Sequence, residues 1–235
     1  MRLDKLLSEM GIASRSEARV ACKSGQVLVD GIAFRDSSCH VDPDKQSIVY
    51  RGREISYRKY TYVMLNKPEG YVSATEDSRL PVVTELLDGE LRKMELFPVG
   101  RLDRDTTGLM ILTNNGPLAH RVLSPKHHVP KVYRFSAAEP MADGVEETFR
   151  DGVVLADGYE CKSALIELDP DRMGGFITLT EGKYHQIKRM GASTHTRVVT
   201  LERVSFGEIA LDTSLARGEY RLLTDSEIAT LEKQN

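Results

Sequence analysis

The sequence predicts an α+β protein in two parts: a small N-terminal α+β module, and a larger domain with a mostly antiparallel mixed sheet flanked by helices. Two observations predict this. The first 34 residues read as two short helices and a hairpin, whereas the chain after residue 61 alternates strand-like runs with turn signals. A polar, basic segment without clear periodicity separates them over residues 54–60. We therefore expect one domain over residues 1–57 and another over 61–235.

Local signals define the N-terminal module. Four apolar residues recur at helical spacing in the first turns: Leu3, Leu6, Leu7 and Met10. Ser14 and Glu17 have the spacing of a capping box, which predicts a second helix, and Gly25 can end that helix in a left-handed conformation. Asp30 and Gly31 then join two apolar runs, and this dipeptide is typical of a type I′ hairpin. The predicted order is helix, helix, hairpin.

The larger domain is predicted from its strand-like runs. These runs cover residues 62–65, 110–113, 133–137, 176–180 and 198–204. They alternate with turn signals and with few helical stretches, so a mostly antiparallel sheet is favoured over a doubly wound parallel one.

Composition and charge restrict the class of protein. The chain has 235 residues, of which 40% are hydrophobic and 29% charged, with a net charge of -3. No apolar run is long enough to span a membrane and no signal peptide is recognisable, so we expect a cytoplasmic protein. Cys22, Cys39 and Cys161 are scattered, which fits neither a disulfide framework nor a zinc site.

Residues 116–138 carry four Lys or Arg and no carboxylate. A phosphate-backbone partner and a merely solvated basic face explain this local charge equally well.

The segment GRLDRDTTGLMILTNNG, residues 100–116, is the most informative for chemistry. It lacks the third acidic position and the distal glutamate of a calcium loop, and it lacks the G-K-[ST] ending of a P-loop. From spacing alone, an Asx-turn or helix-capping role for Asp103 or Asp105 is favoured. A catalytic role on a loop held by the scaffold is the other reading.

Two resemblances change this balance. RLDKLLSEMGIASRSEARVACKSGQVLVDG resembles the S4-type RNA-binding domain. Three cations in its second helix, Arg15, Arg19 and Lys23, are four residues apart and so share one stripe. A stripe like this is often only a soluble surface, but the resemblance implies a path for a phosphate backbone.

The rest of the chain is similar to the pseudouridine synthases of the ribosomal small-subunit type. The similarity rests on GRLDRDTTGL, LNKPEGYVSAT, SPKHHVPKVY, EGKYHQIKRM and GEYRLLT in the order and spacing of that family. In the family the aspartate after Arg-Leu is the catalytic group, which implies Asp103 here. The Ser-Pro-x-His-His segment points to the branch that acts on 16S, small-subunit rRNA.

The resemblance also implies roles for other residues. An ionised aspartate in a dry pocket needs a cation, and the family's basic residue bonded to the aspartate corresponds to Lys188, with Arg189 as the reserve choice. Tyr133 corresponds to the tyrosine that packs against the target base, and Leu201 to the apolar residue on the opposite wall. A solvated Lys-Arg pair, a core tyrosine and a buried strand leucine are the ordinary explanations of these residues.

Further residues are expected to contact RNA. Arg101 and Arg104 flank the aspartate and are candidates for binding phosphates or opening the helix around the target. Lys131, His127 and His128 are expected to line the RNA path. A metal site at the two histidines is not favoured, because neighbouring residues of a strand point to opposite faces.

The expected reaction is the isomerisation of a specific uridine to pseudouridine, without a cofactor or metal, because substrate and product contain the same atoms. The expected partner is 16S rRNA or a small-subunit assembly intermediate, and a monomer is the default. A non-catalytic RNA-binding assembly factor and a metal-dependent nuclease are the alternatives. Residues 191–197, GASTHTR, depart from the family's more apolar, aromatic segment, which casts doubt on the packing next to Lys188.

Overall fold

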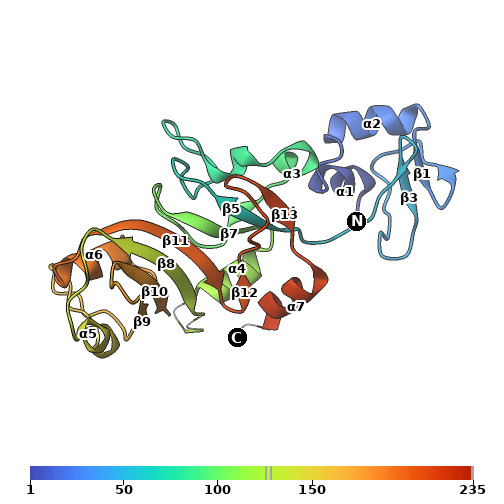
Figure 1. Ribbon diagram of the computed structural model, residues 1–235. Helices are drawn as coiled ribbons and strands as arrows, with labels where there is room; N and C mark the ends of the chain where they lie inside the picture. The colour runs from blue at the N-terminus through green and yellow to red at the C-terminus, as the bar shows by residue number, and fades with distance from the viewer. Residues whose placement is uncertain (125, 128, 234–235) are drawn as a thin grey trace. The chain divides into compact units, whose positions relative to one another are not determined.

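The structure is a computed structural model that describes residues 1–124, 126–127 and 129–233 (Figure 1). The chain forms two compact units. The first comprises Met1–Thr61 and Leu87–Leu96, and the second comprises Tyr62–Leu86 and Phe97–Asn235. The segment 87–96 therefore packs with the N-terminal residues although it follows the first strand of the second unit.

The first unit consists of a helix pair and a small sheet. Its helices are α1 (Leu3–Glu9), α2 (Arg15–Lys23) and α3 (Gly89–Lys93). Its antiparallel sheet has the order β2 (Ile32–Ala33), β1 (Val27–Val29), β3 (Ile48–Tyr50) and β4 (Arg53–Glu54). The predicted helix pair and first hairpin are confirmed, whereas the pairing of β3 and β4 was not predicted.

The predicted local signals of this unit are present. The Ser14 hydroxyl accepts a hydrogen bond from the Glu17 backbone N–H, and the Glu17 carboxylate accepts from the Ser14 backbone N–H, which completes the capping box. Asp30 and Gly31 have φ angles of 51° and 79° at the turn between β1 and β2. Both lie in the left-handed region that a type I′ turn requires.

The second unit is built on a sheet of nine strands among the described residues. The order along its main path is β13 (Tyr220–Leu222), β5 (Tyr62–Lys67), β7 (Thr107–Thr113), β11 (Val198–Phe206), β8 (Lys131–Ala137), β10 (Gly174–Leu179) and β9 (Leu165–Leu168). Two short strands pair beside this path, β6 (Phe97–Pro98) with β7 and β12 (Ile209–Ala210) with β11. The prediction of a mostly antiparallel mixed sheet is confirmed: β7 and β11 are parallel, and the other strand pairs described in this sheet are antiparallel.

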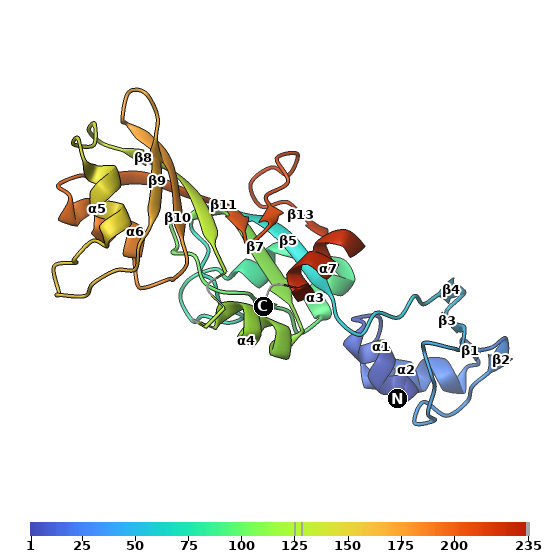
Figure 2. The same cartoon turned by 90° about the horizontal axis from the view of Figure 1, so that it is seen from below.

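Helices cover the sheet of the second unit. They are a short 3₁₀ helix (Val83–Leu86), α4 (Gly116–Leu123), α5 (Val145–Asp151), α6 (Gln186–Ser193) and α7 (Asp225–Lys233). α5 packs against β9, α6 against β11 and α7 against β12. Figures 1 and 2 both show α5, α6, β9 and β10 gathered at one end of this sheet. The described residues contain no helix that is both long and apolar enough to cross a membrane.

The parallel contact between β7 and β11 depends on Gly108. This residue has a φ of 97°, and a Cβ atom there would lie 2.3 Å from the Arg203 carbonyl oxygen. A larger residue would force the two strands apart. Glycine thus allows the segment that leads into β7 to lie close against β11, and this segment contains Asp103.

Candidate active site

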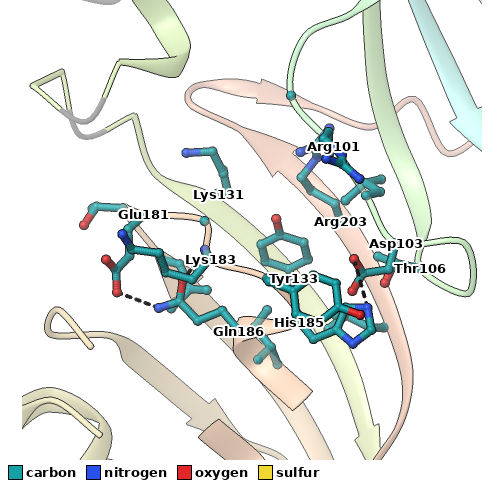
Figure 3. A pocket seen from close by; sticks show the side chains of 18 of the residues that line it. Arg101, Asp103, Thr106, Lys131, Tyr133, Glu181, Lys183, His185, Gln186 and Arg203 are labelled. Carbon is teal, nitrogen blue, oxygen red and sulfur yellow. Dashed lines mark hydrogen bonds and ion pairs between the residues drawn. The ribbon is translucent and has the colours of Figure 1, made fainter. Parts of the chain in front are cut away.

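A cavity of about 590 Å³ lies in the second unit (Figure 3). Among the described residues, six stretches of chain line it: the loop before β7, the end of α4, the first half of β8, residues 159–162, the segment from the end of β10 into α6, and the middle of β11. Pockets that bind small molecules have volumes of roughly 300–1,000 Å³. Four of the sequence segments singled out above therefore contribute to one cavity, although they are far apart along the chain.

Asp103 lies on the loop that leads into β7, and its side chain is 30% exposed. The loop is fixed on both sides of this residue. The Ser73 hydroxyl donates to the Leu102 carbonyl and accepts from the Leu102 backbone N–H, and the Thr106 backbone N–H donates to the Asp103 carbonyl. The Thr106 hydroxyl lines the cavity, is buried and has no hydrogen-bond partner among the described residues. The loop thus presents a carboxylate and an unused hydroxyl to the cavity.

Lys67, at the end of β5, holds the backbone of the same loop. Its fully buried ammonium donates hydrogen bonds to the carbonyl oxygens of Asp103 (3.1 Å), Arg104 (3.3 Å) and Thr106 (2.8 Å). Burial lowers the pKa of Lys67 to about 8. Nearby carboxylates, Asp105 first, partly oppose this effect. Lys67 was not predicted as a site residue, although it lies in the LNKPEGYVSAT motif.

The expected pairing of Lys188 with Asp103 is wrong in this structure. The Lys188 ammonium lies 2.5 Å from an oxygen of Asp105, and this hydrogen bond lowers the pKa of Asp105. The reason is local geometry, because the turn after Asp103 places Asp105 on the outer side, where its side chain is 66% exposed. Lys188 still lines the cavity. Arg189, the reserve choice, is paired with Asp157 and does not belong to the cavity lining.

The side chain beside the Asp103 carboxylate is instead His185, whose Nε2 lies 3.6 Å from the Asp103 Oδ1. His185 directly precedes α6 and has left-handed backbone angles, with φ 47° and ψ 37°. Its ring is stacked on that of Tyr184, with centroids 3.9 Å apart and an interplanar angle of 16°. A non-glycine residue in this conformation is uncommon and often marks a functional position. His185 belongs to the EGKYHQIKRM motif, but no role was predicted for it.

Tyr133 and Leu201 both lie in the cavity wall, as expected. Tyr133 is on β8 and Leu201 on the neighbouring strand β11, and both side chains are buried apart from their cavity-facing edges. Figure 3 shows the Tyr133 ring in the middle of the site, with Asp103 and His185 on one side of it. A nucleotide base could stack on the face of the Tyr133 ring while its sugar lies next to the Asp103 carboxylate.

Two cations line the cavity close to Tyr133. Lys131 is on β8, and Arg203, directly across from Tyr133 on β11, is 1% exposed. The Arg203 Nε donates to the Leu109 carbonyl oxygen at 2.8 Å. Burial lowers the pKa of Arg203, and it lowers that of Lys131 to about 8. Lys131 was expected to face RNA, whereas Arg203 was missed because a charged residue in an apolar strand gives no periodic signal.

The far side of the cavity carries a polar cluster around Glu181. The carboxylate accepts hydrogen bonds from the Gln186 amide (2.6 Å), the Tyr159 hydroxyl (2.8 Å) and the Lys162 backbone N–H (3.0 Å). The Lys183 ammonium lies 4.8 Å from the centre of the Tyr159 ring. No role was predicted for this cluster from the sequence. Its side chains line the cavity on the side opposite the Asp103 loop.

The remaining expected RNA contacts lie at the rim or elsewhere. Arg101 is exposed and lines the cavity, whereas Arg104 is exposed outside it. His127 lies in a turn and not on a strand, so the expectation of opposite strand faces does not apply to it, and it is not part of the cavity lining. His128 lies outside the described residues. The stripe of Arg15, Arg19 and Lys23 is exposed on α2 in the first unit.

Among the described residues, no group of three or more His, Cys, Asp or Glu side chains is arranged to hold a metal ion. Cys22, Cys39 and Cys161 are free thiols. Burial raises the pKa of Cys22 to about 11 and also raises those of Cys39 and Cys161. These thiols are therefore protonated near neutral pH.

Comparison with known proteins gives a consistent result. Residues 61–193 match the RNA pseudouridylate synthase family, and residues 1–46 match the S4 domain. An uncharacterised RNA pseudouridine synthase of Bacillus subtilis, YtzG, is 45% identical over 98% of both chains. The ribosomal small subunit pseudouridine synthase A of Escherichia coli K12 is 40% identical over 98% of this chain and all of that protein.

A solved structure supports the same assignment. A crystal structure of a pseudouridylate synthase superimposes with a TM-score of 0.69 and 36% sequence identity, and it covers 98% of this chain and 99% of that one. The match therefore extends through both units. From its sequence relatives, its fold and the cavity around Asp103, the chain belongs to the RNA pseudouridylate synthase family and carries an N-terminal S4 domain.

Proposed function

We propose that the protein converts a specific uridine of small-subunit, 16S ribosomal RNA to pseudouridine, with Asp103 as the catalytic residue and without a cofactor or metal. The observation that carries this proposal is the position of the Asp103 carboxylate beside the Tyr133 ring in one cavity. The 40% identity to a small subunit pseudouridine synthase over the full chain supports the choice of RNA.

The reaction sets requirements that the cavity meets. The target uridine must leave its stacked position, and a base held on an aromatic side chain gains roughly 1–3 kcal/mol from stacking. Tyr133 offers that face and Leu201 an apolar wall, along which a detached base can turn without breaking polar contacts. A cavity of about 590 Å³ leaves room for such a rotation.

The chemistry starts at the sugar. Asp103 acts either as a nucleophile at C1′ or as a base that removes the C2′ proton, and both routes break the bond between N1 and C1′. His185 lies 3.6 Å from the carboxylate and Lys67 fixes the loop behind it, so the carboxylate is held in place before substrate binds. The bond between C5 and C1′ then forms as C1′ leaves the carboxylate or C2′ regains its proton from it, the C5 proton passes to water, and N1 takes up a proton.

RNA binding extends beyond the cavity in this proposal. Arg101 at the rim and the α2 stripe of Arg15, Arg19 and Lys23 are exposed cations available to phosphates. The S4 match over residues 1–46 supports an RNA-binding role for that stripe. We also propose that the protein acts as a monomer in the cytoplasm, where its RNA substrate is assembled into ribosomes.

Release of tritium tests the proposal. The full-length protein is incubated in the presence of EDTA with small-subunit rRNA, small-subunit assembly intermediates and large-subunit rRNA, all tritiated at uridine C5. We expect release from a small-subunit substrate at one uridine, and none with Asp103→Asn. A wild-type protein that binds the RNA without releasing tritium, beside an active control synthase, would instead indicate a non-catalytic assembly factor. Loss of activity in EDTA would indicate a metal-dependent enzyme.

A further inference from the structure

Two basic side chains line the cavity next to the Tyr133 ring. Lys131 and Arg203 lie on the neighbouring strands β8 and β11, where Lys131 is paired with Phe206 and Tyr133 with Arg203. The Lys131 ammonium lies 5.4 Å and the Arg203 guanidinium 5.5 Å from the centre of the same buried Phe206 ring. Both side chains line the cavity. We call these two residues the cation pair.

The cation pair lacks a counter-ion among the described residues. The Lys131 ammonium donates to the Val129 carbonyl oxygen at 2.8 Å and the Arg203 Nε to the Leu109 carbonyl oxygen at 2.8 Å. No carboxylate acts appreciably on the pKa of either group, and the charge of Arg203 further lowers that of Lys131. Buried charges in folded proteins are ordinarily paired. This pair therefore contributes a positive potential to the cavity next to Tyr133.

The cavity is consequently polarised. Asp103 lies on one side of the Tyr133 ring, and in the view of Figure 3 Lys131 lies on the other. A uridine with its sugar at Asp103 and its base stacked on Tyr133 would have its ring close to Arg203 and Lys131. The electron-deficient sugar carbon thus faces the carboxylate, whereas the base faces positive charge.

We propose that the cation pair stabilises the negative charge that uracil carries once its bond to the sugar has broken. This inference rests on the proposed function. When the bond between N1 and C1′ breaks, its electron pair remains on the ring, and the charge spreads over N1, the two carbonyl oxygens and C5. The bond between C5 and C1′ then forms as C1′ leaves the Asp103 carboxylate or C2′ takes its proton back from Asp103. The C5 proton passes to solvent water, and N1 takes up a proton from water. Lys131 and Arg203 neither donate nor accept a proton in this sequence.

The cation pair is expected to affect the rate constant of the bound complex and not the affinity for RNA. The uracil ring of bound uridine is neutral, and its charge appears only during the reaction, so the cation pair contributes to the reaction of the bound complex more than to its formation. A pair that served to bind an RNA phosphate would do the opposite, because a phosphate is charged throughout. Affinity and single-turnover rate therefore separate the two roles.

The test uses variants of Lys131, because Arg203 is buried too deeply to be replaced safely. Full-length wild type, Lys131→Met and Lys131→Arg are compared on C5-tritiated substrate RNA under single-turnover conditions at saturating protein, and the Kd for the RNA is measured separately. Lys233→Met, which removes an exposed lysine of α7, is the matched control. Thermal unfolding of each variant shows that it is folded.

We expect Lys131→Met to lower the single-turnover rate constant by about 100-fold, the size seen when one preorganised charge-stabilising group is lost. The Kd is expected to change by less than about threefold, and Lys131→Arg to recover most of the rate because it keeps the charge. Lys233→Met should equal wild type.

Three results would overturn the inference. A weaker Kd with an unchanged rate constant would show a phosphate contact, and an unchanged rate constant and Kd would show no role. A Lys131→Arg variant as slow as Lys131→Met would show that packing, not charge, is what matters. If the wild type itself releases no tritium, the proposed function has failed, and the inference fails with it.

Discussion

A fully buried lysine, Lys67, and a partly buried one, Lys131, have similarly lowered pKa values and different surroundings in the second unit. Burial brings the pKa of both Lys67 and Lys131 to about 8. The Lys67 ammonium donates to four backbone carbonyls, three of them in the Asp103 loop, whereas the Lys131 ammonium donates to one. A lowered pKa thus does not show which groups the amine contacts. The neighbouring groups distinguish the two lysines. Lys67 fixes the backbone of the Asp103 loop, whereas most of the hydrogen-bonding capacity of Lys131 remains available to a substrate.

The largest effect on stability is expected from Lys67→Met. The substitution leaves the Thr106 carbonyl without its hydrogen-bond donor and weakens the bonding of the Asp103 and Arg104 carbonyls, and unsatisfied buried groups cost about 1–3 kcal/mol each. We expect a loss of about 3 kcal/mol in the free energy of unfolding, measured by urea titration.

Lys131→Met is the natural comparison for that variant. It removes a single hydrogen bond and relieves the burial of an uncompensated charge, so its free energy of unfolding should equal or exceed that of the wild type at neutral pH. If Lys67→Met and Lys131→Met lowered the free energy of unfolding equally, the two lysines would not differ in structural role.

Replacing Tyr133 separates stacking from the hydroxyl group. Tyr133→Ala should weaken binding of substrate RNA by about 1–3 kcal/mol, because the aromatic face is lost. Tyr133→Phe retains the ring and should bind as wild type does. Equilibrium binding of substrate RNA measures both. If Tyr133→Ala binds as tightly as wild type, the ring has no stacking role in the complex.

The lowered pKa of Lys131 predicts a dependence of stability on pH. Its value in the folded protein, about 8, lies below the ordinary 10.5. Between these values the unfolded chain binds a proton at Lys131 that the folded chain lacks, so the free energy of unfolding rises with pH. Relative to Lys131→Met, wild type should gain up to about 1.4 kcal/mol per pH unit in this window.

Urea titrations of both proteins at pH 8, 9 and 10 measure this difference, because Lys67 and the other titrating groups contribute equally to both. A difference between wild type and variant that stays constant over the three pH values would contradict a lowered pKa at Lys131.

Exposed cations should behave unlike the buried pair. Replacing Arg15, Arg19 and Lys23 on α2 by glutamine should weaken RNA binding and reduce the slope of log K against log salt by about 1 for each lost phosphate contact. The rate of the bound complex should not change. A salt dependence identical to that of the wild type would show that this stripe does not contact RNA.

Local signals predicted much of the fold because their causes are local. The Ser14–Glu17 capping box, the Asp30–Gly31 turn and the alternation of strand residues each involve neighbouring residues, and the structure contains all three. The packing of residues 87–96 with the first unit was not predictable, because it depends on surfaces distant in the sequence.

The site was predicted less completely than the fold. Family resemblance brought Asp103, Tyr133, Lys188 and Leu201 together, and all four line one cavity. The partner of Asp103 was not predictable, because Asp103 and Asp105 are two residues apart and only the turn decides that Lys188 reaches the second. Arg203 was not predicted for a similar reason. Its burial depends on a hydrogen bond to the Leu109 carbonyl of the neighbouring strand, which is distant in the sequence.

The two aspartates of the loop give the most direct test of the central claim that Asp103 performs the chemistry. Asp103→Asn and Asp105→Asn are compared by single-turnover tritium release at saturating protein on the same C5-tritiated small-subunit RNA. We expect no detectable release with Asp103→Asn and a rate within about tenfold of the wild type with Asp105→Asn, because Asp105 only pairs with Lys188 at the outer side of the loop. Full activity of Asp103→Asn, or loss of activity only with Asp105→Asn, would contradict the account.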